Sequence, residues 1–141
     1  MIKRTQITFL ACGESFRPSS VTAPFSNRED PGDIGSNGRY RGKPLPSGSA
    51  SFDVPEKEKD GIRYLHALVY PLLPILRAAG ATDFTVSITY HYEDQCALGF
   101  DPEETRMLAD FECPVHVDCW PEQEAIQPPQ TTTGSSAPSR V

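Results

Sequence analysis

Three polar side chains, His91, His116 and Asp118, have the types and the spacing for acid–base chemistry. Each lies on the polar side of a segment whose apolar residues alternate, as they do in a half-buried β-strand: 84–92 for His91 and 113–120 for the other two. If these strands are neighbours, the three groups could form an acid–base pair with an orienting carboxylate. The simpler interpretation is an exposed sheet face that carries ordinary polar residues.

A local cluster of positive charge occurs at residues 38–43, Gly-Arg-Tyr-Arg-Gly-Lys. Guanidinium groups bind phosphates and carboxylates through paired N–H donors, so this cluster could contact an anion or an acidic partner. Trp120, at the end of the last expected strand, is the type of aromatic residue that contributes most at protein interfaces. The candidate binding residues are therefore Arg39, Tyr40, Arg41, Lys43, His91, His116, Asp118 and Trp120, and no residue is predicted to be catalytic.

Cys113-x-x-His116-x-x-Cys119 has the composition of a metal triad. On a strand, however, the two cysteines face one way and the histidine the other, so the three cannot converge on zinc. Neither a glycine-rich nucleotide-binding motif nor a G-x-S-x-G nucleophile motif occurs. We expect no metal and no cofactor. The four cysteines, which include Cys12 and Cys96, are expected to be reduced and mostly buried.

The apolar pattern predicts alternating strands and helices along residues 5–120. Two prolines, Pro71 and Pro74, interrupt a helical pattern over 62–79 and predict a break near Val69. Asp101 followed by Pro102 predicts a helix start, with Glu104 completing a capping box. The expected strands are 5–12, 49–54, 84–92, 95–100 (the hairpin partner of 84–92) and 113–120, and the expected helices are 16–23, 62–79 and 101–111.

These elements predict an α+β fold. The expected architecture is a two-layer sandwich, a mostly antiparallel sheet with helices on one face, in the order β-α-β-α-β-β-α-β. Residues 1–120 are expected to form a single domain with a long Gly-rich loop at 25–48. The Pro/Thr/Ser-rich segment 121–141 is expected to be disordered, because it has too little apolar surface to offset its ordering entropy.

Composition limits the classes of partner. The chain has 141 residues and a net charge of −6, with seven basic and four acidic side chains in 1–43 but six basic and fifteen acidic in 44–141. An acidic surface repels phosphates, so nucleic acid is not an expected partner. No apolar stretch is long enough to cross a membrane and none has the form of a signal peptide, so we expect a cytoplasmic protein. The oligomeric state does not follow from the sequence.

The sequence resembles the DUF four-two-seven-nine family of small bacterial domains of unknown function. The resemblance covers roughly residues 5–120 and rests on the segments 16–22, 42–43, 65–76 and, above all, 92–104 leading into 113–120. The longer Gly-rich loop and the Pro-rich tail depart from the pattern. The resemblance implies an α+β domain and brings no activity, catalytic residue or cofactor. Many such bacterial domains look like accessory or immunity-type proteins.

The leading hypothesis is a non-enzymatic cytoplasmic domain that binds another protein, a basic one by charge, and neutralises it as an immunity or inhibitor protein would. The alternative is a small enzyme, or a domain that binds an anion or small ligand, through the polar face carrying His91, His116 and Asp118 and the loop 39–43. The alternative requires these groups to converge on one concave pocket, with the two histidines within about 10 Å.

Overall fold

The computed structural model describes residues 2–122. Its strands form one open sheet in the order β2-β3-β1-β4-β5, and neighbouring strands are antiparallel except β4 and β5, which are parallel. The strands are β1 (Ile2–Gly13), β2 (Asn27–Glu29), β3 (Gly48–Asp53), β4 (Asp83–Tyr92) and β5 (Val115–Pro121). The α-helices are α1 (Gly61–Val69), α2 (Leu73–Ala78) and α3 (Pro102–Asp110), and the 3-10 turns are η1 (Pro18–Ser20), η2 (Gly38–Tyr40) and η3 (Tyr70–Leu72). The predicted α+β class with a mostly antiparallel sheet is confirmed.

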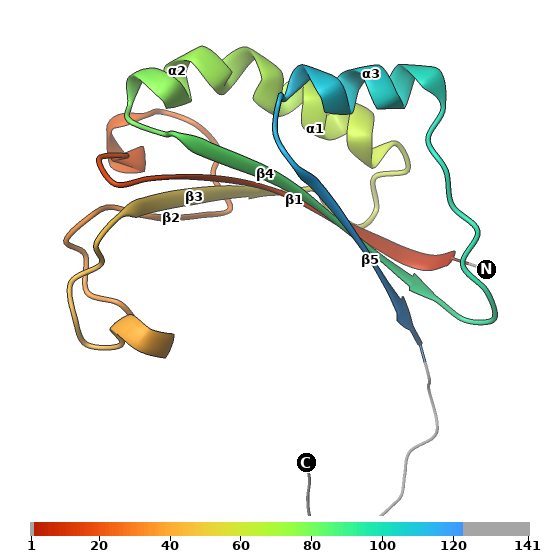
Figure 1. Cartoon of the computed structure of the whole chain (residues 1–141), viewed down its shortest axis with the longest axis horizontal. Helices are drawn as coiled ribbons and strands as arrows, with labels where there is room; N and C mark the ends of the chain where they lie inside the picture. Colours follow the sequence, from red (N-terminus) through yellow and green to blue (C-terminus); the bar gives the residue numbers. More distant parts are fainter. Residues whose placement is uncertain (1, 123–141) are drawn as a thin grey trace, which may run out of the picture.

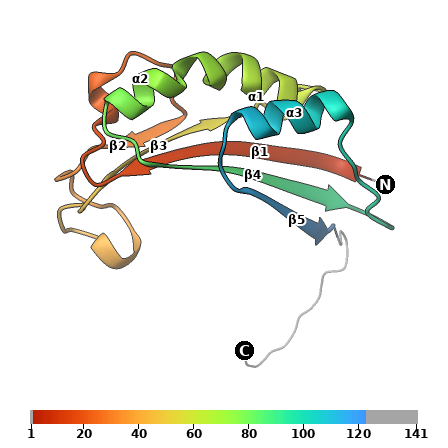
Figure 2. The same cartoon turned by 45° about the horizontal axis from the view of Figure 1, so that its top comes forward.

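The three α-helices lie together on one face of the sheet (Figures 1 and 2). The core forms between the two layers, because alternate residues of the strands direct apolar side chains toward the helices. Phe9 of β1 is central to it: its ring lies 5.5 Å from Phe84 and 5.4 Å from Phe111, which follows α3. From the helices, Leu65, Val69 and Leu76 are fully buried against this face.

The helical layer follows the predicted break. α1 ends at Val69, the turn η3 contains Pro71, and α2 begins with Leu73 and Pro74. Gly80 ends this layer with a positive φ of 109°, and a Cβ there would come within 2.5 Å of the Ser15 carbonyl oxygen. A residue with a side chain would be strained at this position.

The predicted hairpin strand at 95–100 is wrong. These residues form an irregular connection, and the strand beside β4 is β5, which runs parallel to it. β4 has only two edges, and β1 and β5 occupy both of them. A parallel neighbour requires a crossover, and the segment containing α3 provides it.

Two further predictions for the first half of the chain are wrong. The helix expected at 16–23 is only the single 3-10 turn η1, and the loop at 25–48 contains the strand β2, which pairs with β3. Within the same loop, Ile34 and Pro44 form an isolated antiparallel bridge. The observed order of regular elements is therefore β-β-β-α-α-β-α-β rather than the predicted one.

The boundary of the predicted tail also moves. Pro121 belongs to β5, and the Glu122 N–H donates to the Tyr92 carbonyl oxygen at 2.6 Å. The rest of the segment predicted to be disordered, 123–141, lies outside the described residues. Within residues 2–122, none of the helices has the length and apolar character of a membrane span.

Candidate functional site: the uncovered face of the sheet

Within residues 2–122 no α-helix lies on the opposite face of the sheet, here called the uncovered face, and only the loop between β2 and β3, with η2, projects on that side at one edge (Figures 1 and 2). Alternating residues of every strand point to this face, and the strand pairing places them in rows. The central side chains are mostly short and hydroxylated: Thr8, Ser49, Ser51, Thr85, Ser87 and Thr89. The face therefore presents hydrogen-bonding groups on a continuous sheet.

His91 and Trp120 lie together at one corner of this face, because the register of β4 and β5 places them side by side. The His91 Nε2 is 2.9 Å from the Gln6 Oε1, and its Nδ1 is 3.9 Å from a Glu122 carboxylate oxygen. The imidazole is thus held by neighbours, and its side chain is only 15% exposed. Trp120, in contrast, is 60% exposed. The indole is the accessible group of this corner.

His116 and Asp118 lie on the same face, further along β5. The register places His116 beside Ser87 and Asp118 beside Thr89. Since Ser87 and His91 are four residues apart on β4, the two histidines are separated by about 13 Å. That separation is too large for an acid–base pair. Within residues 2–122, the side chains of His116 and Asp118 have neither a hydrogen bond nor an ion pair.

The basic cluster 39–43 lies at the opposite edge of the sheet, in the loop between β2 and β3 (Figure 1). The Arg39 guanidinium lies 5.6 Å from the centroid of the Tyr40 ring, and Arg39, Arg41 and Lys43 are exposed. The eight predicted binding residues therefore form two groups at opposite edges of the sheet. The enzyme alternative required these residues to converge on one pocket, and they do not.

The thiols of Cys96 and Cys119 approach each other closely, with 3.2 Å between their sulfur atoms. Cys96 lies in the connection after β4, and Cys119 lies on the helix-side face of β5. Partial burial and the contact with Cys119 raise the pKa of the Cys96 thiol above its ordinary value. All four cysteines are free and none is fully buried, so the expectation of mostly buried thiols is wrong. Nothing in the local sequence pairs these two residues, because only the path of the connection brings them together.

A second polar pair, His66 and Asp110, lies in the helical layer. The His66 Nε2 is 2.8 Å from an Asp110 carboxylate oxygen, and the imidazole stacks on Tyr70 with 4.8 Å between ring centroids. Tyr70 follows His66 by four residues, a spacing that brings side chains together on a helix and could be found in the sequence. The pairing with Asp110 joins α1 to α3 and has no local signal. The pair thus links two helices.

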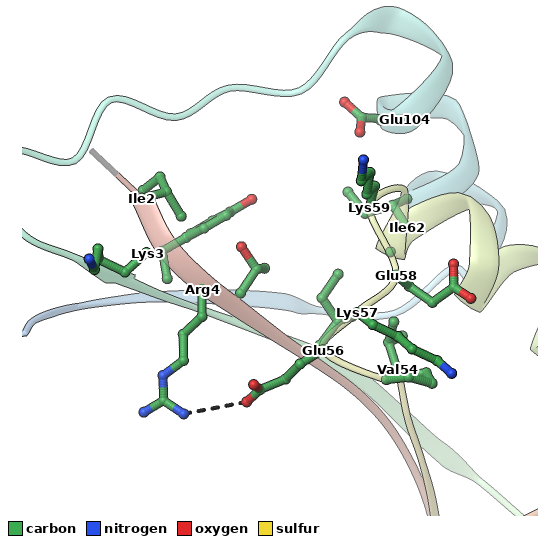
Figure 3. Close-up of a pocket in the computed structure, with 15 residues that line it drawn as sticks. Ile2, Lys3, Arg4, Val54, Glu56, Lys57, Glu58, Lys59, Ile62 and Glu104 are labelled. Atoms are coloured by element: carbon green, nitrogen blue, oxygen red, sulfur yellow. Dashed lines mark hydrogen bonds and ion pairs between the residues drawn. The ribbon is translucent and has the colours of Figure 1, made fainter.

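A cavity of about 490 Å³ lies between the start of β1 and the connection from β3 to α1 (Figure 3). Its lining carries both signs of charge and an apolar part: Lys3, Arg4, Lys57 and Lys59, the carboxylates Glu56, Glu58 and Glu104, and Ile2, Ile7, Val54 and Ile62. Arg4 is 3.3 Å from Glu56, the contact dashed in Figure 3. Burial, and then the Glu104 carboxylate, raises the pKa of the Tyr90 phenol, which also lines the cavity. None of the eight predicted binding residues lines it.

Comparison with family models, with curated proteins and with solved structures finds no match to this chain. The resemblance of the sequence to the DUF four-two-seven-nine family therefore stays a prediction.

Proposed function

We propose that this chain is a non-enzymatic, cytoplasmic protein-binding domain, which binds a basic partner protein through the uncovered face of its sheet. The mode of action that we propose is neutralisation of the partner, as by an immunity or inhibitor protein. The family resemblance of the sequence points to the same class of protein and adds no residue-level support.

The observation that carries the proposal is the uncovered face with Trp120 at its corner. A sheet with helices on only one side leaves its other face for solvent or for a partner. An indole that is 60% exposed beside an ordered imidazole is the kind of group that anchors a protein interface. The hydroxyl rows around it supply hydrogen-bonding groups without a large loss of side-chain entropy on binding.

Charge favours a protein partner of basic character. Residues 44–141 carry fifteen acidic side chains against six basic ones, and Asp118 lies two residues from Trp120 on the same face of β5. This excess speeds association with a positively charged surface and disfavours nucleic acid.

The proposal is tested by affinity capture of the partner from host lysate, with a variant whose added side chain obstructs the uncovered face. Ser87→Arg places a long cation at the centre of the uncovered face, whereas Ile75→Arg places the same side chain on α2, where Ile75 is 49% exposed. We expect one stoichiometric partner, captured by the wild type and by Ile75→Arg and lost with Ser87→Arg. Failure to recover a stoichiometric partner, or equal capture by both variants, would contradict the proposal.

A second candidate function, binding of a small anion, is favoured by the cavity. Four cationic side chains line it against three carboxylates, and within residues 2–122 Lys57 and Lys59 have no ion pair. Calorimetric titration with inorganic pyrophosphate tests this candidate. We expect binding that the double variant Lys57→Ala/Lys59→Ala removes. If titration of the wild type with pyrophosphate releases or absorbs no heat of binding at either of two temperatures, anion binding at this cavity is excluded.

A further inference from the structure

Among residues 2–122, β5 has a neighbouring strand on one side only. It is the last strand of the sheet, parallel to β4, and within residues 2–122 no other strand lies along its outer edge. Every residue of Val115–Pro121 after the first is exposed. Such an edge presents unpaired backbone groups to any strand that can add to it.

The hydrogen bonds to β4 determine which groups are free. Val86 N–H donates to the Pro114 carbonyl oxygen at 3.0 Å, and Glu122 N–H donates to the Tyr92 carbonyl oxygen. In a parallel pair, alternate residues direct both backbone groups to the neighbouring strand, so the even-numbered positions of β5 face β4. The N–H and C=O groups of Val115, Val117 and Cys119 consequently point away from the sheet. Pro121, which has no N–H, shares this outward position.

We propose that the edge of β5 pairs with β5 of a second copy of this chain, antiparallel and about a two-fold axis at Val117, so that two sheets join into one. In this register the outward N–H and C=O groups of the two copies lie opposite each other. Val117 pairs with Val117 of the second copy, and Val115 pairs with Cys119 of the second copy. These pairs exchange about six backbone hydrogen bonds. A C2 interface of this kind requires the same patch on both copies, which a single edge strand provides.

The side chains select this register. With the axis at Val117, His116 lies opposite Asp118 of the second copy, twice by symmetry, and an imidazole N–H can donate to the carboxylate. Moving the axis by one residue would set His116 against His116 or Asp118 against Asp118. Two aspartates directly opposite each other destabilise a sheet by charge repulsion, and a pair of histidines there would lose the contact between His116 and Asp118. Neither side chain has a partner of its own within residues 2–122.

The two exposed apolar groups of β5 also gain contacts. The side chain of Val117, which is 38% exposed, would contact Val117 of the second copy on the helix side of the sheet. Trp120 lies opposite Pro114 of the second copy and keeps its ring on the uncovered face. The dimer would therefore extend the proposed binding face rather than cover it.

Sedimentation velocity of the purified full chain over a range of concentrations tests this inference without the partner protein. We expect a dimer that dissociates on dilution. Val117→Pro removes an outward donor that β4 does not use, and an edge strand tolerates proline at such a position, so the variant should be monomeric. Val117→Thr keeps the donor and should dimerise as the wild type does.

The charge pair provides an independent test that leaves the backbone intact. His116→Glu places two carboxylates opposite each other at both ends of the pairing and should weaken the dimer about tenfold. The double variant His116→Glu/Asp118→Lys restores opposite charges and should recover it. A wild type that is monomeric at every concentration would overturn the inference. A double variant that dimerises no more tightly than His116→Glu would overturn it as well. Circular dichroism checks that each variant is folded, and if Val117→Pro is not, the charge swap decides.

Discussion

Replacing Asp101 with alanine removes the side-chain cap of α3, and the structure shows what is lost. The Asp101 Oδ1 accepts a hydrogen bond from the Glu104 N–H at 2.7 Å, and the Glu104 side chain accepts one from the Asp101 N–H at 2.9 Å. The second carboxylate oxygen of Asp101 lies 3.3 Å from an Arg63 nitrogen on α1. The substitution therefore breaks the predicted capping box and one link between the two helices.

The expected cost is the sum of these two effects. Loss of an aspartate cap costs about 1 kcal/mol. The ion pair to Arg63, with side chains 35% and 52% exposed, adds little to this cost because solvent screens it. Asp101→Ala should thus lower the free energy of unfolding by about 1–2 kcal/mol, a shift of about 0.5–1 M in the urea midpoint for a domain of this size. Asp101→Asn keeps a capping oxygen and should cost about half as much.

Asp60 provides the matched control. It precedes α1 at the same position, but its side chain makes no capping hydrogen bond. Asp60→Ala should move the urea midpoint by less than about a quarter of the Asp101→Ala shift. Equal midpoints for the wild type and Asp101→Ala, or equal losses for the two alanine variants, would refute the capping argument.

Three further changes have defined outcomes. Leu76 is fully buried, so Leu76→Ala should cost about 2–5 kcal/mol in urea unfolding, and a loss below 1 kcal/mol would contradict its place in the core. Hydrogen bonds from Ser19 lower the pKa of the Asp30 carboxyl in the folded protein. Ionised Asp30 therefore stabilises the fold at pH values above about 3.9, the pKa of an aspartate in the unfolded chain. This stabilisation is lost as the pH falls through the lower pKa of the folded state. The stability difference between the wild type and Ser19→Ala should accordingly narrow below about pH 4, and a difference constant from pH 7 to pH 2 would contradict this. Glutathione disulfide should oxidise Cys96 and Cys119 to an intramolecular disulfide, with two glutathiones released, and mass spectrometry should find the bond in Cys12→Ser but not in Cys119→Ser.

The sequence predicts those elements whose signal is local. The alternation over 84–92 becomes β4, with Phe84, Val86 and Ile88 buried. Proline and aspartate act through the backbone of their own turn, so the break after Val69 and the cap at Asp101 are found where expected. Both signals depend on neighbours within four residues.

The order in which the strands pair across the sheet could not be predicted from the sequence. The apolar residues of 95–100 suggest a strand, but β5 takes the edge of β4 on which a hairpin partner would lie. β2 has only three residues, all exposed, and no apolar alternation reveals it. His91 and His116 do share a face, as predicted, yet their separation depends on a register that no local pattern determines.

Hydroxyl-radical footprinting of the captured complex tests the central claim most directly. Trp120 lies on the uncovered side by the register of β5, and Tyr70 lies in η3 between α1 and α2. They are 60% and 45% exposed, so both aromatic rings should react readily in the free protein. If a partner binds the uncovered face, oxidation of Trp120 should fall severalfold in the complex while oxidation of Tyr70 is unchanged. Protection of Tyr70 with Trp120 still fully reactive would contradict the assignment of the binding face.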